Sequence, residues 1–352
     1  MSTSPPILQL NPNHLPVRRL WLLLILSGGF LLVSRSPVSA QGDSLWQNIP
    51  VHDPVMIRQD SVYYVFCTGF GITMWSSTNR KDWRREPPVF NKPPSWAVEA
   101  VPGFKGHIWA PDISYYNGLY YLYYAVSAFG KNTSCIGLAV NKTLHTDSPD
   151  YRWEDLGKVI QSVPGRDMWN AIDPNLALDD KGMPWLAFGS FWNGIKLVRL
   201  TADRRAVAQP ESWFTIASRP RNSILPDSVA GDAAIEAPFI FKKAPYYYLF
   251  VSFDYCCRGE KSTYKMVVGR SEKIEGPYLD RDGVLMTLGG GSTVLEGDKN
   301  WNGVGHNAVV SFAGIDYLVF HGYDANDHGR SKLRIEKLNW FNNWPVVLPR
   351  AE

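Results

Sequence analysis

The sequence predicts an all-β protein folded as a five-bladed β-propeller. Three observations predict this fold. One two-strand pattern recurs five times, the copies are spaced about 60 residues apart, and aromatic residues, which favour strands, make up 13% of the chain. Units of this length with several antiparallel strands each are typical of propeller blades. A β-sandwich would not repeat the same hairpin at this period.

Each copy of the pattern begins with a polar or small residue, usually followed by a proline. A short apolar strand, a turn and a strand rich in Tyr, Leu, Val and Phe follow. The residues of this proline column are Pro54, Pro111, Pro174, Pro238 and Asn307, with successive gaps of 57, 63, 64 and 69 residues. The copies read "HDPVMIRQDSVYYVFCTG", "WAPDISYYNGLYYLYYAVS", "IDPNLALDDKGMPWLAFGS", "EAPFIFKKAPYYYLFVSF" and "GHNAVVSFAGIDYLVFHGY".

The segments between and after the paired strands complete the predicted blades. The expected hairpin turns are Gln59-Asp60, Asn117-Gly118, Asp180-Lys181-Gly182, Lys243-Ala244 and Ala313-Gly314. A third strand follows each hairpin, as "GITMWSS", "CIGLAVN", "GIKLVRLT", "YKMVVGRS" and "SKLRIEKL". No helical periodicity interrupts the five copies. We therefore expect residues 41–352 to form one five-bladed β-propeller catalytic domain, with the blades starting near residue 44.

The first forty residues have the layout of a secretory signal peptide. Arg18 and Arg19 precede an apolar run from Leu20 to Val33, and small residues lead up to Ala40. The alternative, a membrane anchor, is disfavoured because the run has 14 residues, against the roughly 20 that span a bilayer. We expect residues 1–40 to be removed near Ala40 and the mature protein to be secreted, extracellular or periplasmic, without a membrane segment.

Charge and cysteine content exclude several classes of protein. Of the 36 Lys and Arg residues, three lie in the first forty, so the mature chain has 33 basic against 33 acidic side chains. This balance argues against a nucleic-acid partner, and we expect a monomer. Four cysteines are too few for a disulfide scaffold, and Cys256-Cys257 lacks zinc-site spacing. Export would permit a disulfide, but the sequence does not indicate one.

Acidic residues precede the proline column in two copies and lie one step earlier in a third. The residues before the column are Asp53, Ala110, Asp173, Ala237 and His306, and Glu236 comes just before Ala237. Because the first strand of each blade lines the central channel, these positions should converge at one end of it. A single Asp-Pro is common turn chemistry, and the alternative reading is that these acids cap strand ends or bind structural cations. Three carboxylates in register favour a catalytic site instead.

Three converging carboxylates fit the hydrolysis of glycosidic bonds. One carboxylic acid protonates the leaving oxygen, and one carboxylate activates water or attacks carbon. A third carboxylate nearby raises the pKa of the acid by like-charge repulsion and keeps it protonated near neutrality. The aromatic content also suits a protein that stacks on sugar faces.

The ordered set "HDP", "WAPDI", "NAIDP", "EAPF" and "GHN" resembles glycoside hydrolase family 43 over residues 44–352. It is most similar to the secreted arabinanases of that family, which cleave α-1,5-linked L-arabinofuranosyl chains. The resemblance implies that Asp53 is the general base, that Glu236 is the general acid, and that Asp173 tunes and orients the acid. It also implies inversion at the anomeric carbon, with the catalytic carboxyls roughly 6.5–9.5 Å apart.

The resemblance further implies a metal ion, Ca²⁺ in most relatives, at the propeller axis beside His306, with water completing its shell because calcium prefers oxygen ligands. A buried core histidine without a ligand is the alternative for His306. His52 either contacts the sugar or supports Asp53. The substrate-binding residues implied for arabinan or arabino-oligosaccharides are Asp53, Trp109, Phe129, Gly130, Asn170, Ala171, Ile172, Asp173, Ser190, Phe191 and Trp192. Core packing is the alternative for each aromatic residue.

Three readings of the activity remain open. Endo-action on arabinan is the first, favoured because no module is expected after the fifth blade. An exo-acting arabinofuranosidase or β-xylosidase of the same family would need one end of the cleft closed by loops. A non-catalytic sugar-binding propeller would lack at least one catalytic carboxylate, and all three are in place.

Overall fold

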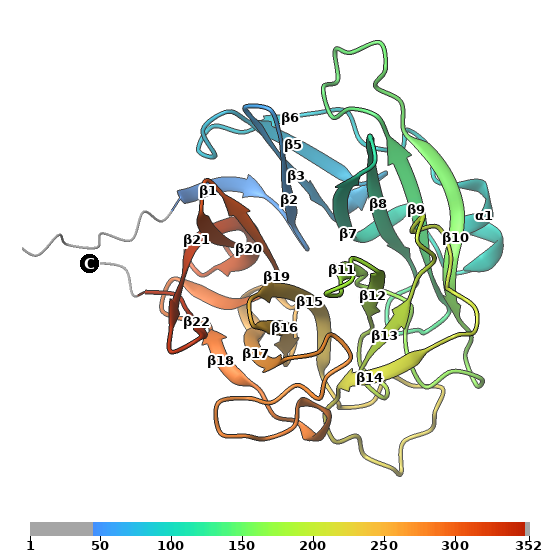
Figure 1. The fold of residues 1–352 in the computed structure, drawn as a ribbon, viewed down its shortest axis with the longest axis vertical. Coiled ribbons are helices and arrows are strands. Elements are labelled where there is room, and N and C mark those ends of the chain that lie inside the picture. The colour runs from blue at the N-terminus through green and yellow to red at the C-terminus, as the bar shows by residue number, and fades with distance from the viewer. Residues whose placement is uncertain (1–44, 349–352) are drawn as a thin grey trace, which may run out of the picture. The chain divides into compact units, whose positions relative to one another are not determined.

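A computed structural model describes residues 45–348, and these residues form a ring of five antiparallel β-sheets, the five blades of a β-propeller (Figure 1). The chain runs once round the ring, from blade I, drawn in blue, to blade V, drawn in red. The predicted five-bladed fold is therefore confirmed. The predicted signal peptide, residues 1–40, lies outside the described residues.

Blades I to IV each contain four strands counted from the axis outward, and blade II adds the short β4 (Gly69–Phe70) beside its innermost strand. Blade I has β2 (Val55–Gln59), β3 (Val62–Cys67), β5 (Thr73–Ser77) and β6 (Arg84–Arg85); blade II has β7 (His107–Tyr116), β8 (Leu119–Val126), β9 (Ser134–Asn141) and β10 (Glu154–Ser162). Blade III has β11 (Asn175–Leu178), β12 (Pro184–Phe188), β13 (Ile195–Arg199) and β14 (Trp213–Ala217); blade IV has β15 (Ile235–Lys243), β16 (Tyr246–Phe253), β17 (Lys265–Ser271) and β18 (Ser292–Leu295).

Blade V closes the ring with a strand from the other end of the described chain. Its inner strands are β19 (Trp301–Phe312), β20 (Ile315–Asp324) and β21 (Arg330–Phe341). β1 (Leu45–Pro50) pairs with β21, as does the short β22 (Trp344–Val346). Figure 1 shows the blue β1 beside the red β21. The first described strand thus joins the last blade to the start of the chain, a pairing that the sequence pattern did not predict.

The predicted strand pattern is confirmed in each blade, with two shifted turns. All five predicted third strands exist, as β5, β9, β13, β17 and β21. Gln59 ends β2 and Lys243 ends β15, so these two hairpins turn one residue later than predicted. In the second case Pro245, which has no N–H to donate to a sheet, lies in the turn. The segments between the strands contain the one-and-a-half-turn helix α1 (Ser95–Ala100) and the 3₁₀ turns Gly259–Lys261 and Met286–Leu288.

The hydrophobic core lies between neighbouring blades. The faces of each sheet carry Val, Ile, Leu, Tyr and Phe on both sides, because each blade is covered by a blade on either face. Four clusters of buried side chains fill the five contacts of the ring. They join blade I to blades II and V (Phe66, Leu122 and Val319), blade II to III (Tyr123 and Phe188), blade III to IV (Trp185 and Leu249) and blade IV to V (Phe250 and Phe320).

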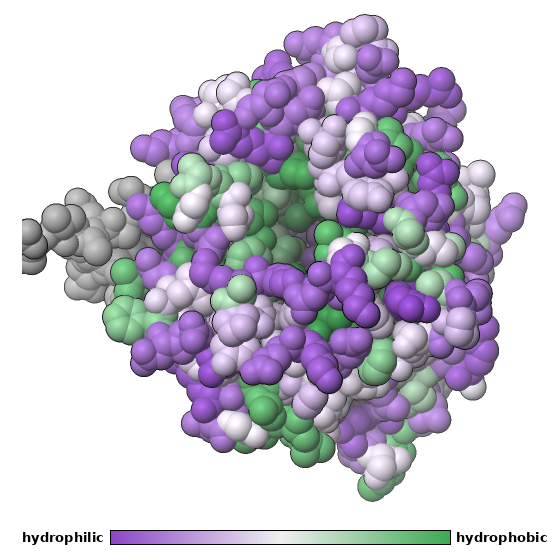
Figure 2. Space-filling model, viewed as in Figure 1, coloured by the Kyte–Doolittle hydropathy of each residue, from purple (hydrophilic) through white to green (hydrophobic). Residues whose placement is uncertain are grey.

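The surface of the protein is more polar than this core. In the view of Figure 2, hydrophilic residues cover most of the face, and hydrophobic residues show chiefly in recesses near its middle. Within residues 45–348, no helix has the length and apolar character needed to cross a bilayer.

Truncating one side chain of the blade IV–V cluster should destabilise the ring. Phe320 is completely buried there, so Phe320→Ala should lower the free energy of unfolding by about 3–5 kcal/mol, through lost burial and the cavity left behind. Phe341→Ala is the matched control, since Phe341 is 70% exposed and its loss should change stability by about 0.5 kcal/mol or less. Urea denaturation of both variants measures the difference, and equal midpoints would contradict this account of the core.

Candidate active site

The five residues before the proline column share one unusual backbone conformation. These axial residues all have positive φ angles, in the left-handed region that residues with a side chain usually avoid. The angles are 53° at Asp53, 44° at Ala110, 58° at Asp173, 54° at Ala237 and 52° at His306. Because the same turn occurs at the start of the inner strand of every blade, the side chains on either side of it converge on the axis.

Hydrogen bonds from the preceding blade hold four of these five turns. In each case the backbone N–H of the axial residue donates to a side chain of the neighbouring blade. Asp53 donates to Nδ1 of His321 at 3.1 Å, Ala110 to Oγ1 of Thr68 at 2.9 Å, Ala237 to Oδ2 of Asp173 at 3.0 Å, and His306 to Oγ of Ser252 at 2.8 Å. The convergence therefore depends on contacts across the blade interfaces.

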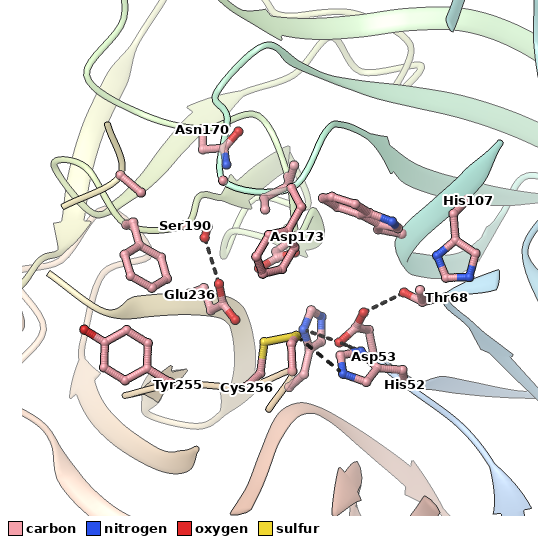
Figure 3. A pocket seen from close by; sticks show the side chains of 18 of the residues that line it. His52, Asp53, Thr68, His107, Asn170, Asp173, Ser190, Glu236, Tyr255 and Cys256 are labelled. Carbon is pink, nitrogen blue, oxygen red and sulfur yellow. Dashed lines mark hydrogen bonds and ion pairs between the residues drawn. A yellow bond between two sulfur atoms is a disulfide. The ribbon is translucent and has the colours of Figure 1, made fainter. Parts of the chain in front are cut away.

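A cleft of about 850 Å³ opens above these turns. Asp53, Asp173, Glu236 and His306 all line it, and they come from blades I, III, IV and V. Figure 3 shows the side chains of Asp53, Asp173 and Glu236 around this one cavity. The predicted meeting of three carboxylates from different blades is what the structure contains.

Asp53 is held as a carboxylate. Oγ1 of Thr68 donates to its Oδ2 at 2.5 Å, while Nδ1 of His52 and Nδ1 of His306 lie 2.8 Å and 3.0 Å from its Oδ1 (Figure 3). Burial alone would raise the pKa of Asp53, but His52 and His306 outweigh burial and hold that pKa well below its usual range. A carboxylate that stays ionised is suited to accept a proton.

The two buried histidines beside Asp53 differ in charge. Burial lowers the pKa of His306, but the carboxylates of Asp53 and Asp173 overcome this and raise it to about 9. Burial and the nearby His52 hold the pKa of His321 well below its usual value. His321 is therefore neutral and can accept the N–H of Asp53 on Nδ1, while His306 carries the positive charge next to the carboxylate.

Glu236 is held by two hydroxyl groups. Oγ of Ser190 donates to its Oε2 at 2.7 Å, and the phenol of Tyr264 donates to its Oε1 at 2.8 Å. Burial raises the pKa of Tyr264 well above its usual value, so its phenol keeps its proton. Both oxygens of Glu236 therefore have a fixed partner at the cleft wall.

Asp173 connects the two other carboxylates. It is buried, and burial, opposed by His306 and assisted by Glu236 and Asp53, raises the pKa of Asp173 to about 8. Asp173 therefore keeps its proton near neutrality. The bond from Ala237 to Asp173 fixes the backbone beside Glu236. Asp173 thus both retains a proton in the site and orients the strand that carries Glu236.

All of the predicted substrate-binding residues except Ala171 line the cleft. Ala171 is completely buried behind the wall, where its N–H donates to Oγ of Ser162 at 3.0 Å, and it does not line the cleft. Trp192 shows only an edge, since it is 1% exposed and its indole donates to the carbonyl of Asp227. Phe129, 81% exposed, stands at the rim. The lining residues are Asp53, Trp109, Phe129, Gly130, Asn170, Ile172, Asp173, Ser190, Phe191 and Trp192.

Sequence reasoning missed the polar residues that support the carboxylates. Thr68, Ser252 and His321 hold the axial turns, and each lies at or near the end of the second strand of its blade. The aligned copies carry a polar residue near this point every time, namely Thr68, Ser127, Ser190, Ser252 and His321. That column was a readable signal. Tyr264, by contrast, precedes a third strand and had no equivalent in the other copies.

The residues around His306 do not by themselves form a calcium shell. Among residues 45–348, the groups of three side chains close enough to share an ion are His52, Cys256 and Cys257, and His52, Asp53 and His321. Neither group includes His306, whose Nδ1 pairs with Asp53. Ca²⁺ takes six to eight oxygen ligands, so water would have to supply nearly all of them. We derive no step of the chemistry through an ion.

Comparisons with known proteins agree with the fold. The sequence model of Glycosyl hydrolases family 43 matches residues 48–345. The chain is 50% identical over 338 residues to an extracellular exo-α-(1→5)-L-arabinofuranosidase of Cellvibrio japonicus, covering 96% of both chains. It is 43% identical over 326 residues to an extracellular endo-α-(1→5)-L-arabinanase of Bacillus subtilis, covering 91% of this chain and 94% of the relative.

Two solved structures of arabinanases have the same fold as this chain. The α-L-arabinanase of Cellvibrio cellulosa complexed with arabinohexaose superposes with a TM-score of 0.84 at 53% identity, covering 85% of this chain and 95% of that one. An exo-1,5-α-L-arabinanase from a bovine ruminal metagenomic library superposes with a TM-score of 0.82 at 50% identity, covering 89% and 100%.

Replacing Asp173 with Asn should change the pH dependence of the reaction. Asn keeps an oxygen that can accept the N–H of Ala237 but removes the ionisable carboxyl group beside Glu236. A neighbouring carboxylate raises the pKa of an acid, so its loss should let Glu236 lose its proton at lower pH. The basic limb of the rate profile should therefore move to lower pH. The control is Asp180→Asn, on an exposed turn outside the cleft. An unmoved limb in Asp173→Asn would refute the influence of Asp173 on the pKa of the general acid.

Proposed function

The chain belongs to family 43 of the glycosyl hydrolases, and on that premise we propose that it hydrolyses α-1,5-L-arabinofuranosidic bonds in arabinan and arabino-oligosaccharides. One observation carries the proposal. In a single cleft, Asp53 is held ionised between two histidines, Glu236 is oriented by two hydroxyl groups, and Asp173, whose pKa burial raises to about 8, keeps its proton near neutrality. The substrate follows from the two relatives above, which are named for their action on α-(1→5)-linked L-arabinose units.

The proposed mechanism uses each carboxyl group in a different role. Asp53, oriented by Thr68 and His52, takes a proton from the attacking water. Glu236, oriented by Ser190 and Tyr264, gives a proton to the leaving oxygen. Asp173 accepts the N–H of Ala237 and so holds the backbone next to Glu236, and it places a second carboxyl group beside the acid. Attack by water opposite the leaving group inverts the anomeric carbon, which requires carboxyls roughly 6.5–9.5 Å apart.

The mode of attack on the polymer is the finer part of the proposal. The sequence pattern favoured endo-action. Two relatives named as exo-acting share 50% identity with this chain, against 43% and 46% for two named as endo-acting, and this difference favours release from chain ends. We therefore propose exo-action on α-1,5-arabinan and retain endo-action as the second candidate. We further propose that the protein is exported, since two of the relatives are named extracellular. We also propose that it acts as a monomer.

The direct test compares the protein with Glu236→Gln on linear α-1,5-arabinan. Gln keeps contacts for Ser190 and Tyr264 but cannot give a proton, so the release of reducing sugar should fall by about 10²–10⁴-fold. Glu272→Gln, on the exposed surface of blade IV, is the matched control and should retain full activity. Equal activity of the protein and Glu236→Gln would reject the catalytic assignment and favour a sugar-binding propeller.

The same assay distinguishes the mode of attack and the substrate. Arabinose or one fixed short oligosaccharide in the first minutes indicates exo-action, whereas a ladder of lengths indicates endo-action. Release of xylose from β-1,4-xylo-oligosaccharides, with arabinan left intact, would favour the β-xylosidase alternative.

The calcium ion predicted beside His306 stays a prediction, and it has a test that does not depend on activity. After dialysis against chelator and then against micromolar Ca²⁺, elemental analysis should find about one calcium per chain, held in a shell of water at the propeller axis beside His306. His306→Ala should abolish that stoichiometry while Cys135→Ala, in the core of blade II, should not. No retained calcium in the intact protein would refute the prediction.

A further inference from the structure

A disulfide between adjacent cysteines forms part of the cleft wall. Cys256 and Cys257 are bonded to each other in the loop between β16 and β17 of blade IV, and both line the cleft that holds the three carboxylates (Figure 3). All four cysteines of the chain lie within the described residues, and the other two, Cys67 and Cys135, are buried free thiols. The single disulfide therefore lies at the site and not in the core.

The disulfide turn is connected to the general base through three hydrogen bonds. The backbone N–H of Cys257 donates to the phenol oxygen of Tyr323 at 2.7 Å. That phenol lies 2.8 Å from Nε2 of His52, and Nδ1 of His52 lies 2.8 Å from Oδ1 of Asp53. Sγ of Cys257 also lies 3.8 Å from Nε2 of His52. A loop of blade IV thus reaches the base of blade I through a residue of blade V.

The direction of these bonds selects one form of His52. Burial raises the pKa of Tyr323, so its phenol keeps its proton. Its oxygen accepts from the N–H of Cys257, and its proton can donate to Nε2 of His52 because the carboxylate of Asp53 only accepts at Nδ1. Nε2 is then an acceptor, and a neutral imidazole must carry its proton on Nδ1, where it donates to Asp53. The tautomer that orients the base follows from the position of the N–H of Cys257.

The covalent bond fixes that N–H. A disulfide between neighbours closes a small ring that contains their peptide bond, and Cys257 has the left-handed φ of 66°. The ends of the turn are anchored as well: Thr263 donates its N–H to the carbonyl of Tyr255 at 2.9 Å, and Arg258 donates its N–H to Oγ of Ser262 at 3.1 Å. Without the bond between the sulfurs, the left-handed backbone would relax, since residues with side chains avoid it.

We propose that the Cys256–Cys257 disulfide turn is a positioning element for catalysis, which holds Tyr323 and, through it, His52 in the orientation that donates to Asp53. The inference rests on the proposed function only for the role of Asp53 as the base. Neither cysteine takes part in the chemistry, and the disulfide stays oxidised throughout the cycle.

The kinetic test uses arabinohexaose and the double variant Cys256→Ser/Cys257→Ser. Because the sugar contacts remain and the base is misoriented, kcat should fall about 10- to 100-fold while KM changes by less than about twofold. Treating the intact protein with a phosphine reductant should reproduce the loss, and reoxidation should restore kcat. This arm stands even where the double variant fails to fold. Cys135→Ser, at a buried free thiol that does not line the cleft, should keep the kcat of the intact protein.

A second variant tests the route through Tyr323. Tyr323→Phe removes the hydroxyl that joins Cys257 to His52 and should lower kcat by a similar factor. If the disulfide acts through this hydroxyl, reducing it in Tyr323→Phe should cause no further loss, because contacts in one pathway are not additive. Additive losses, or an unchanged kcat in either variant, would overturn the proposal.

A spectroscopic readout separates this proposal from the proposed function. In protein labelled with ¹⁵N-histidine, the intact disulfide should give His52 protonated at Nδ1, and reduction or Tyr323→Phe should shift the population toward Nε2. An Nδ1 tautomer that ignores both changes would refute the positioning role. A protein inactive on arabinan that still shows the tautomer shift would refute the proposed function alone.

Discussion

The left-handed turn at the axial residues is the constraint on which the site depends. A left-handed conformation costs a residue with a side chain roughly 1–2 kcal/mol, and one hydrogen bond returns only about 0.5–1.5 kcal/mol. The turns at Asp53, Ala110, Ala237 and His306 are each held by a side chain of the preceding blade. They therefore persist only because packed blade interfaces keep those partners in place. The hydrophobic clusters between blades are, in this sense, part of the active site.

Some residues serve the scaffold and the chemistry at once. Thr68 accepts the N–H of Ala110 and donates its own proton to Asp53, so a single hydroxyl joins blade II to the base. Asp173 accepts the N–H of Ala237 with the same carboxyl group that keeps its proton near neutrality beside Glu236. Since one group does both, the loss of activity in a variant at either position combines a chemical effect with a change in backbone geometry. Conservative replacements are needed to separate the two.

The sequence predicted the parts of the structure that repeat and missed the parts that do not. The hairpins and the three carboxylates could be found because each blade presents them at the same point, and local strand pairing sets their positions. β1 has no copy in the other blades, and its partner β21 lies almost 300 residues away, so no local pattern signals the pairing. Ala171 was expected at the sugar, but the segment before β11 turns Ile172 toward the cleft and buries Ala171. The disulfide turn lies in a loop outside the repeats, where the sequence carries no register.

The hydrolysis proposed here needs one carboxyl group ionised and another protonated at the same pH, within one cleft. The structure distributes the partners accordingly. Asp53 lies against His52 and the positively charged His306, and these stabilise the anion alone. Glu236 contacts only hydroxyl groups at its two oxygens, and a hydroxyl can donate to a carboxylate or accept from a carboxylic acid. Glu236 can thus give up a proton and regain it without losing its orientation, whereas Asp53 is biased toward the form that takes one. The division between acid and base follows from which blade supplies imidazole and which supplies hydroxyl.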